Sequence, residues 1–254
     1  MAEAYNETDK KNPIKLSSTL ETLNPRKYKR YLIKEFNTRL SNVCNDQRCW
    51  IRQSFINKMN NQDIYTIKKK IFRPKGPNGK TTWLNTFNID DVMKQYEDKY
   101  SDFKFFGAVP IDFDSLSEIE ISSDYDFKKL INNGKHKIGV VFNLDESWKP
   151  GSHWVACYSD LKKGTVYFFD SYGYNPEKRI RKLLRSIARY IKDVEKKHPV
   201  VNYNKVRHQY DNYDCGVYSI NFIQRLLDGE TFENITQNKT IDNKMRENRE
   251  VYFT

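Results

Sequence analysis

The sequence predicts an α+β fold in which a small mixed, mostly antiparallel sheet is packed between helices, with a helical domain ahead of it. Two observations support this prediction. Three short apolar segments, rich in β-branched and aromatic residues, lie between residues 137 and 170 and are separated by polar loops. An amphipathic segment follows at about 176–196, and another apolar, helix-like run begins at Cys215. This order of elements is typical of an α+β sandwich.

The composition indicates a globular protein with a basic surface. The chain has 254 residues, enough for one large domain or two small ones. Its 44 Lys and Arg residues exceed its 33 Asp and Glu residues, which gives a net charge of +11. Such a charge is compatible with a lysine-rich soluble surface, or with attraction to nucleic acid or to an acidic protein.

Hydrophobic runs and cysteines together predict an intracellular protein. No apolar run approaches the ~18 residues of a membrane span, and no apolar segment follows the polar start of the chain. The four cysteines, Cys44, Cys49, Cys157 and Cys215, are irregularly spaced. We therefore expect free thiols in a reducing compartment.

The first eighty residues are predicted to form a tail and a helical arm. Residues 1–23 are polar and aperiodic, so we expect a flexible tail. Residues 24–80 form the predicted arm domain, which starts with a helix capped at Asn24-Pro25. Apolar side chains four residues apart then mark one helix face, at Tyr28, Leu32, Phe36 and Leu40, and a second short helix is expected to carry Ile51, Phe55 and Met59.

Two features inside the arm have alternative readings. Cys44 and Cys49 could begin a zinc site, but no second pair and no nearby histidine completes four ligands, so we predict a structural turn and no metal. The basic segment Lys68–Lys80 contains prolines and glycines and lacks the spacing of a phosphate-binding loop. We expect it to be a connector, with residues 81–254 as the core domain.

The core domain is predicted to alternate between helices and strands. Its first helix follows Trp83-Leu84-Asn85, with Asn88 and Asp91 as a capping pair. We expect strands at 103–111, 137–143, 153–158, 165–170 and 200–206, a long helix at 176–196 and a last helix from Cys215 to a stop at Gly229.

Polar residues at the ends of two predicted strands suggest chemistry. His153 begins one strand and Asp170 ends the next. If the two strands pair antiparallel through the turn at 162–164, the imidazole and the carboxylate meet at one edge of the sheet. The carboxylate can then orient the histidine, which can deprotonate a thiol. His136, His198 and His208 lack a carboxylate at a comparable strand end, and we expect structural or surface roles for them.

The nucleophile that completes this set is Cys215. It lies at a predicted helix N-terminus, where the dipole and the free N–H groups favour a thiolate. Gln209, six residues earlier, can donate its amide N–H to an oxyanion beside the backbone N–H of Cys215. His153, Asp170, Gln209 and Cys215 together predict a cysteine hydrolase, although any one of them alone would more often be structural.

These residues match a known family. Gly151–Trp154, Tyr167–Ser171 and Gln209–Gly216 resemble the adenain and SUMO-protease (Ulp-type) cysteine peptidases. A closer likeness, to the African swine fever virus type of polyprotein-processing protease in large DNA viruses, runs from about residue 25 to the end. It is carried by Cys44–Cys49 after a basic helix, Asn85–Asp90, His153–Ala156 and Val206–Gln209.

The resemblance implies roles for individual residues. It implies His153 as general base, Cys215 as nucleophile, Asp170 as orienting residue and Gln209 as oxyanion donor. Where the viral protease has asparagine as third triad member, this chain has Asp170, as the SUMO proteases do. The resemblance also implies that Trp83, Asn85 and Trp154 bind substrate, with the two indoles flanking a tunnel that admits only Gly-Gly. A slot too narrow for any Cβ selects glycine by exclusion.

Our leading hypothesis is a cysteine endopeptidase that cleaves after Gly-Gly in viral precursor proteins during assembly, with no cofactor. It would act as a monomer in the host cytoplasm, at sites of virus assembly, and in the virion core. One alternative is an isopeptidase that removes a ubiquitin-like modifier from host proteins. Another is a nucleic-acid-associated core protein in which the Cys-His-Asp set is vestigial, since the net charge is +11.

Overall fold

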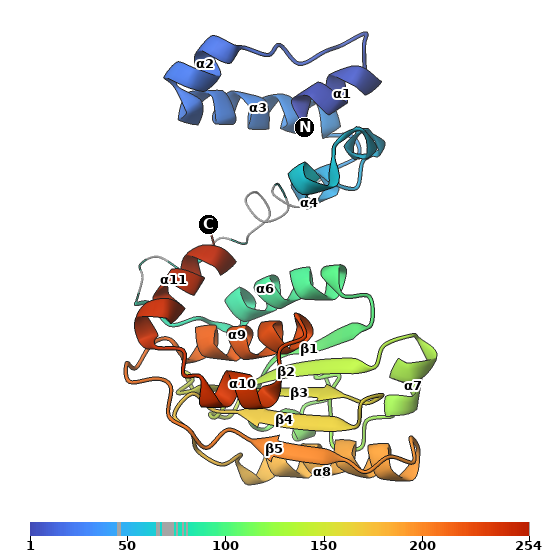
Figure 1. Cartoon of the computed structure of the whole chain (residues 1–254), viewed down its shortest axis with the longest axis vertical. Helices are drawn as coiled ribbons and strands as arrows, with labels where there is room; N and C mark the ends of the chain where they lie inside the picture. The colour runs from blue at the N-terminus through green and yellow to red at the C-terminus, as the bar shows by residue number, and fades with distance from the viewer. Residues whose placement is uncertain are drawn as a thin grey trace. The chain divides into compact units, whose positions relative to one another are not determined.

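A computed structural model describes residues 1–44, 47–64, 67, 74, 76–77, 79 and 81–253, with the backbone alone at 26, 47 and 48. The chain divides into an N-terminal unit, Met1–Arg73, and a core unit, Pro74–Thr254. The division falls within the basic segment that we expected to be a connector, most of which lies outside the described residues. Figure 1 shows the elements of both units.

The N-terminal unit is helical, as predicted. Its described elements are α1 (Ala2–Thr8), α2 (Ser18–Leu23), α3 (Pro25–Leu40), α4 (Gln47–Trp50) and the 3₁₀ helix η1 (Ser54–Lys58). Asn24 caps α3 by accepting a hydrogen bond from the backbone N–H of Lys27, with Pro25 at the first helical position. The single short helix expected around Phe55 is instead split into α4 and η1.

The first 23 residues contain helices where we predicted a flexible tail. The Tyr5 ring packs edge-on against the rings of Phe36 and Phe55, at centroid distances of 5.9 and 5.5 Å. The Asn6 side chain exchanges two hydrogen bonds with the backbone of Ile14, which is buried. The prediction was wrong because α1 is stabilised by partners about 30 to 50 residues away, and a local search for periodicity does not detect them.

Cys44 and Cys49 are joined by a disulfide, which corrects our expectation of free thiols at these two positions. The predicted turn between them includes two residues outside the described part of the chain. Cys157 and Cys215 are free, as expected. In the described residues no group of three or more His, Cys, Asp or Glu side chains could hold a metal ion, and no helix is long and apolar enough to cross a membrane.

The core unit is built on a five-stranded mixed sheet in the order β1-β2-β3-β4-β5. The strands are β1 (Phe103–Pro110), β2 (Lys137–Asn143), β3 (Trp154–Asp160), β4 (Thr165–Phe169) and β5 (Val200–Tyr203). The two inner pairings, β2–β3 and β3–β4, are antiparallel, as the predicted meander required. The two outer pairings, β1–β2 and β4–β5, are parallel.

Helices cover both faces of the sheet. The helical elements of the core unit are α6 (Thr86–Lys99), the 3₁₀ helix η2 (Phe113–Ser115), α7 (Phe127–Asn132), α8 (Lys178–Asp193), α9 (Cys215–Leu227), α10 (Phe232–Gln237) and α11 (Asp242–Tyr252). Figure 1 shows α6 and α9 on one side of the sheet and α8 on the other. The predicted sandwich of a sheet between helices is therefore confirmed.

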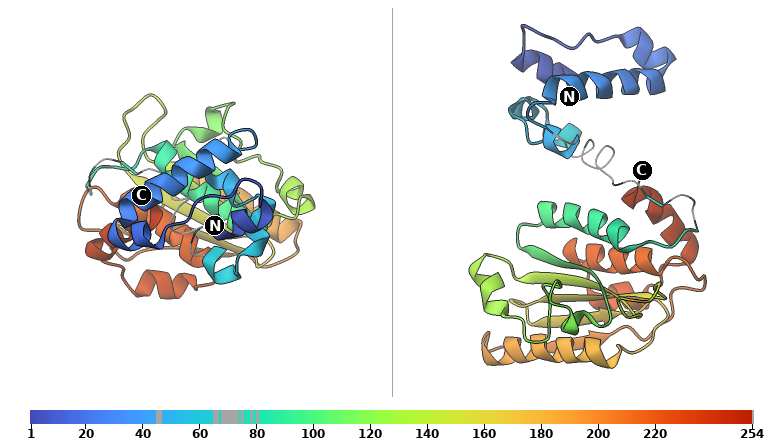
Figure 2. Two further views of the ribbon diagram at one scale, coloured as in Figure 1. Left: turned by 90° about the horizontal axis from the view of Figure 1, so that it is seen from above. Right: turned by 180° about the vertical axis from the view of Figure 1, so that it is seen from behind.

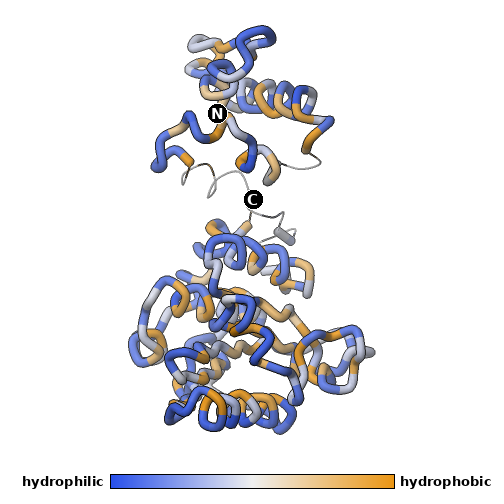
Figure 3. Tube along the Cα trace, turned by 90° about the vertical axis from the view of Figure 1, so that its right-hand side faces the viewer, coloured by the Kyte–Doolittle hydropathy of each residue, from blue (hydrophilic) through white to orange (hydrophobic). Residues whose placement is uncertain are grey.

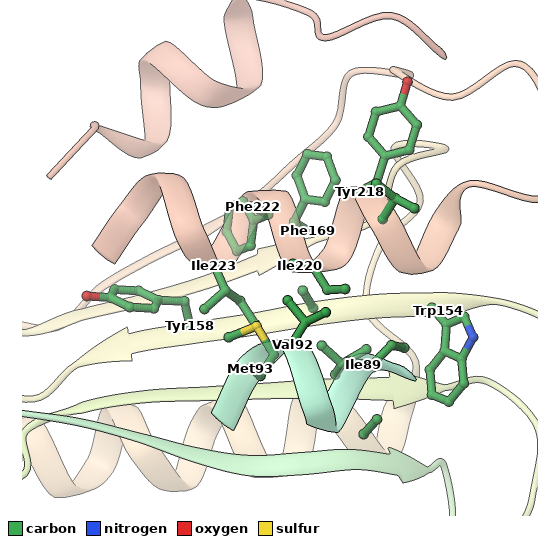
Figure 4. Packing of buried hydrophobic residues seen from close by; sticks show 14 of the residues in the cluster. Ile89, Val92, Met93, Trp154, Tyr158, Phe169, Tyr218, Ile220, Phe222 and Ile223 are labelled. Carbon is green, nitrogen blue, oxygen red and sulfur yellow. The ribbon is translucent and has the colours of Figure 1, made fainter. Parts of the chain in front are cut away.

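Successive side chains of a strand point to opposite faces of the sheet, and each face packs into its own hydrophobic core. Trp154, Ala156 and Tyr158 of β3 pack with α6 and α9, whereas Val155 and Cys157 pack with α8. In Figure 4, labelled side chains from α6 and α9 meet over the strands, among them Met93 and Ile223. In α8 the apolar residues recur every three or four positions, with charged residues between them. Only one face of this helix is therefore buried (Figure 3).

The helix α6 begins one turn earlier than we predicted. Asn85 accepts a hydrogen bond from the backbone N–H of Asn88 at 2.9 Å, and the Asn88 side chain accepts one from the backbone N–H of Asn85 at 3.1 Å. This reciprocal capping box replaces the expected pair of Asn88 and Asp91. The start of α6, just after the segment that contains Trp83, is therefore fixed by Asn85 and Asn88.

Candidate active site

His153 and Asp170 meet at the end of the β3–β4 pairing. The last paired residues at that end are Ala156 and Phe169, and the two polar residues lie just beyond them. The Nε2 atom of His153 lies 2.8 Å from the Oδ1 atom of Asp170. The Asp170 side chain is 2 % exposed and that of His153 is 12 % exposed, so this contact is shielded from water.

The second ring nitrogen of His153 is left for Cys215. The side chain of Cys215 lies close enough to the imidazole to help raise its pKa. Because Nε2 contacts Asp170, Nδ1 is the ring nitrogen that remains to accept the thiol proton. The structure thus brings together the three residues that we predicted as a triad, from β3, from the end of β4 and from the first residue of α9.

The pKa of His153 is raised to about 9. Burial lowers this pKa, but the hydrogen bonds and negative charges of Asp170 and Cys215 outweigh burial and favour the protonated ring. An imidazole with such a pKa is basic enough to accept a proton from a neighbouring group at neutral pH. The arrangement therefore places a basic ring beside the side chain of Cys215.

Tyr172 is a part of the site that our reading of the sequence missed. Its ring stacks on the His153 ring at a centroid distance of 4.7 Å and an interplanar angle of 22°. Its backbone N–H donates to Oδ1 of Asp170 at 2.8 Å, and its hydroxyl donates to the backbone carbonyl of Asp211 at 2.9 Å. Tyr172 therefore connects the histidine, its carboxylate and the loop before Cys215. The only feature of the sequence that could have indicated a role for Tyr172 in the site is its position two residues after Asp170.

Gln209 is fully buried and both ends of its amide are bonded. Its Oε1 accepts from the Ser171 hydroxyl at 2.6 Å. Its Nε2 donates to the backbone carbonyl and to Oδ1 of Asp211, at 3.1 and 2.9 Å. The amide therefore belongs to the network around the Cys215 loop. The amide makes no hydrogen bond to Cys215, and its role as an oxyanion donor stays a prediction.

The loop before Cys215 is held by a residue from the far end of the chain. Arg249 of α11 is 6 % exposed, and its Nε donates to Oδ1 of Asp214 at 2.6 Å. Its two terminal nitrogens donate to the backbone carbonyls of Thr82 and Tyr213, at 2.8 and 3.0 Å. One guanidinium thus joins α11 to the residue before the nucleophile and to the segment before Trp83.

Asp214 is fully buried, and burial raises its pKa to about 7 although Arg249 opposes the shift. It occupies the N-cap position of α9, but its side chain makes no capping hydrogen bond. Because the carboxylate contacts Arg249 instead, we infer that this pair fixes the start of α9. Arg249 carries no local sequence signal, and only the fold reveals its role.

The predicted substrate residues lie close to the start of α9. The indole N–H of Trp154 donates to the backbone carbonyl of Leu84 at 2.8 Å, which ties this ring to the segment that contains Trp83. Leu84 also packs on Gly216, where an added Cβ would lie 3.0 Å from the Cβ of Leu84. Trp83 itself is 46 % exposed, whereas Asn85 is the cap of α6. The segment therefore passes next to Cys215.

A second histidine corrects our expectation about the others. His136 contacts Oδ1 of Asp160 at 2.9 Å and Oδ2 of Asp102 at 3.2 Å, so it does have a carboxylate at a strand end. Both of its ring nitrogens are taken by carboxylates, and none is left for a thiol. His208 is buried, and one of its ring nitrogens contacts the backbone carbonyl of Thr236 at 3.2 Å. Both residues fit the structural roles that we assigned to them.

Replacing Asp170 with asparagine should lower the pKa of His153. In the wild type this ring should titrate near pH 9 in an NMR titration of the four histidines, and in Asp170→Asn it should titrate closer to its ordinary value of 6.5. The pKa of His153 is higher in the folded protein than in the unfolded chain. The stabilisation that Asp170 gives the folded protein through the protonated ring is therefore complete below about pH 6.5 and is lost as the pH rises through about 9. The difference in unfolding free energy between the two proteins should therefore shrink over that window. An unchanged histidine pKa in Asp170→Asn would contradict the assigned geometry.

Removing the Arg249 guanidinium should destabilise the core unit and lower activity together. Arg249→Met leaves the buried Asp214 carboxyl and two backbone carbonyls without their donor, so we expect the unfolding free energy to fall by about 3 kcal/mol. Denaturant titration and kcat/KM would measure the two effects. Arg246→Met, three residues earlier on α11, is the matched control, because its buried Nε has no hydrogen-bond partner. Equal loss of stability in both variants would argue against the role assigned to the Arg249 hydrogen bonds.

Comparisons with known proteins agree with this site. Residues 131–252 match the model of the Ulp1 protease family, C-terminal catalytic domain. A protein of Acanthamoeba polyphaga mimivirus described as a thiol protease is 36 % identical over 259 aligned residues, which cover 100 % of this chain and 85 % of the relative. The cysteine protease of African swine fever virus is 23 % identical over 226 residues, covering 83 % of each chain.

A solved structure shows the same fold. The crystal structure of the African swine fever virus protease aligns with a TM-score of 0.63 and 21 % identity, over 90 % of each chain. At this identity the match supports the fold alone. The family assignment rests on the mimivirus relative, which is similar over the whole chain and well above 30 % identity. The protein belongs to the Ulp1 protease family and is a cysteine-type peptidase.

Proposed function

We propose that the protein is an endopeptidase that cleaves after Gly-Gly in viral precursor proteins during particle assembly. The observation that supports this most strongly is the 2.8 Å contact of His153 with Asp170, together with the raised pKa of His153, to which both Asp170 and Cys215 contribute. In this proposal Cys215 is the nucleophile, His153 the general base and acid, and Asp170 the residue that orients and stabilises the imidazolium.

The proposed reaction proceeds through a covalent acyl-enzyme. The Cys215 thiol gives its proton to His153, and the thiolate attacks the carbonyl carbon of the scissile bond. The resulting tetrahedral intermediate collapses, the C–N bond breaks, and His153 returns the proton to the leaving amine. Water then attacks the thioester with His153 as base, which releases the carboxylate product and restores the thiol.

The oxyanion of this intermediate needs hydrogen-bond donors. The backbone N–H of Cys215, at the first residue of α9, is one candidate, since a helix N-terminus favours negative charge. Gln209 is the second candidate, and its buried amide is anchored through Ser171. The Nε2 protons of Gln209 point to Asp211, so in this proposal an oxyanion would take over the longer of the two bonds, the one of 3.1 Å to the Asp211 carbonyl.

A narrow slot explains the proposed preference for glycine. The Trp154 indole is fixed by its bond to Leu84, and Leu84 rests against Gly216 beside the nucleophile. In this proposal, a substrate that reaches Cys215 past Trp83 and Trp154 lies between two indole rings that leave no room for a Cβ. Asn85 would act by holding the entry of α6 rather than by touching substrate, because its side chain is used in the capping box.

The viral setting of the proposal comes from the relatives. The two viral relatives are proteins of mimivirus and African swine fever virus, and the latter is also described as a SUMO-1 cysteine protease. We infer action on viral precursors as a monomer, at assembly sites in the host cytoplasm and in the virion core. Release of a ubiquitin-like modifier would use the same site and the same Gly-Gly chemistry, so substrate tests must include both.

A Gly-Gly probe should label Cys215 in a reaction that depends on His153. The full-length protein would be incubated with a peptide ending in Gly-Gly vinyl methyl ester and analysed by intact mass and peptide mapping. We expect one adduct on Cys215 in the wild type, none in Cys215→Ala, and a large loss of labelling rate in His153→Ala. Cys157 is fully buried in β3 and serves as the internal control.

The outcome separates the proposals. Labelling of Cys157, or labelling of Cys215 at the same rate without His153, would mean that the proposed thiol activation is absent. If labelling behaves as expected, cleavage of a Gly-Gly-containing linear precursor and of a ubiquitin-like protein joined to lysine would then be compared at equal concentration. Faster turnover of the lysine conjugate would favour the isopeptidase over the precursor protease.

Trp83→Ala should widen the slot and reduce the preference for glycine. We expect the ratio of kcat/KM for Gly-Gly and Ala-Gly peptides to fall roughly tenfold, because the wall that excludes a Cβ is removed. Trp148→Ala is the matched control, since this tryptophan is 77 % exposed and we assign it no role in the slot. An unchanged ratio in Trp83→Ala would remove Trp83 from the proposed slot while leaving the Cys215 chemistry untouched.

A further inference from the structure

One face of α8 carries a straight row of cations. Lys178, Arg181, Arg185, Arg189 and Lys192 are all exposed and are spaced three or four residues apart, so they lie on one side of the helix. We call this set the basic stripe. The buried face of α8, with Ile180, Leu184 and Ile187 among its residues, points the opposite way into the core. At 1.5 Å per residue the stripe is about 21 Å long.

The cations of the stripe are not neutralised. Within the described part of the chain, none of the five forms an ion pair or donates a side-chain hydrogen bond. Their neighbours on the same helix do: Lys182 contacts Asp114 at 2.7 Å, and Arg179 contacts Glu146 at 3.3 Å. Asp114 and Glu146 are therefore used beside the stripe, and Asp193, at the last position of α8, is the one exposed carboxylate of the helix itself. The stripe from Lys178 to Arg189 is thus a field of one sign. A surface of this kind attracts a polyanion.

The chemistry of the stripe favours nucleic acid over a protein partner. Protein interfaces usually have an apolar or aromatic centre, but none of the large exposed hydrophobic residues in the described chain lies within Lys178–Asp193. Three of the five cations are arginines, whose planar guanidinium groups match phosphate oxygens. A stripe of about 21 Å runs past about six phosphates of one strand at 3.4 Å each.

A duplex fits this surface better than a single strand. Proteins that hold single strands stack the bases on aromatic side chains, and the stripe offers none. A continuous line of cations on a rigid helix instead matches the regular backbone of a double helix. Cations spread along one side of a helix contact backbone phosphates, which carry no sequence information, so the binding would not depend on sequence.

The stripe lies on the side of the core unit away from the nucleophile. α8 packs on the core that receives Val155 and Cys157 of β3, whereas Cys215 and Trp154 belong to the core on the other face of the sheet. Figure 2, from behind, shows α8 along the border of the core unit with the strands between it and α9. A duplex on α8 would therefore leave the site around Cys215 open to a protein substrate.

We propose that the basic stripe of α8 is a sequence-independent binding surface for the phosphate backbone of duplex nucleic acid. The peptidase would then remain on nucleic acid while its catalytic face is turned to protein. The inference rests on charge and exposure and does not depend on Gly-Gly specificity. It can therefore hold or fail independently of the proposed function.

The test is fluorescence anisotropy with the full-length protein and a labelled 24-bp DNA duplex of random sequence. Arg181→Gln, Arg185→Gln and Arg189→Gln would be combined in one variant. We expect the Kd to rise roughly tenfold or more at 0.1 M salt, and the slope of log K against log salt to become shallower by about 3. Lys94→Gln, Lys239→Gln and Lys244→Gln, at exposed positions outside α8, form a control variant with the same change in net charge.

Each outcome decides the proposal. Strong weakening in the stripe variant, little change in the control variant and unchanged turnover of a short peptide would support it. Equal weakening in both variants would show a general effect of net charge and would overturn it. Wild-type binding to the duplex no tighter than binding to a heparin fragment of similar charge, or tighter binding to a 24-nucleotide single strand, would overturn it as well. Circular dichroism would confirm that both variants are folded.

Discussion

The antiparallel pairing of β3 with β4 is the constraint on which the site depends. Ala156 lies opposite Phe169, and this pairing brings the end of β4 beside the start of β3, where His153 contacts Asp170. A shift of one residue would turn every side chain of a strand to the other face. Because the side chains on the two faces of β3 pack into two different cores, such a shift would place each set of side chains in the other core. Core packing and catalytic geometry are thus held by the same hydrogen-bond ladder.

The nucleophile is held by a different set of contacts. Cys215 begins α9, and the loop before it is supported by Asp211, by the hydroxyl of Tyr172 and by Arg249 from the last helix. Several of these supports are single hydrogen bonds to backbone carbonyls. They determine where the thiol lies relative to the imidazole, while the apolar face of α9 determines only that the helix packs on the sheet. Stability and positioning are therefore supplied by different residues of one segment.

The two faces of the core unit have different chemistry. One side of the sheet contains the indole of Trp154, the helix start at Cys215 and the segment around Leu84, which are mostly apolar and closely packed. On the other side, α8 buries an apolar face and exposes a row of cations. The net charge of +11 is thus partly gathered on an element away from the candidate active site. The cations of α8 can therefore bind a partner without blocking the site around Cys215.

The sequence by itself determined the order of the five strands and of α6, α8 and α9, because short β-branched runs and a strongly amphipathic helix are local patterns. The short helix α7 and the last two helices, α10 and α11, were not predicted. It also determined the set His153, Asp170 and Cys215, since each lies at the end of an element whose pairing can be inferred. Only the tertiary structure decided that Tyr5 anchors α1, that Cys44 and Cys49 are joined, and that Arg249 reaches Asp214. The structure also showed that the Gln209 amide bonds to Asp211. The reason is physical: periodicity reports which face of an element is buried, whereas a hydrogen bond or ring contact between residues far apart in the chain depends on how the elements pack.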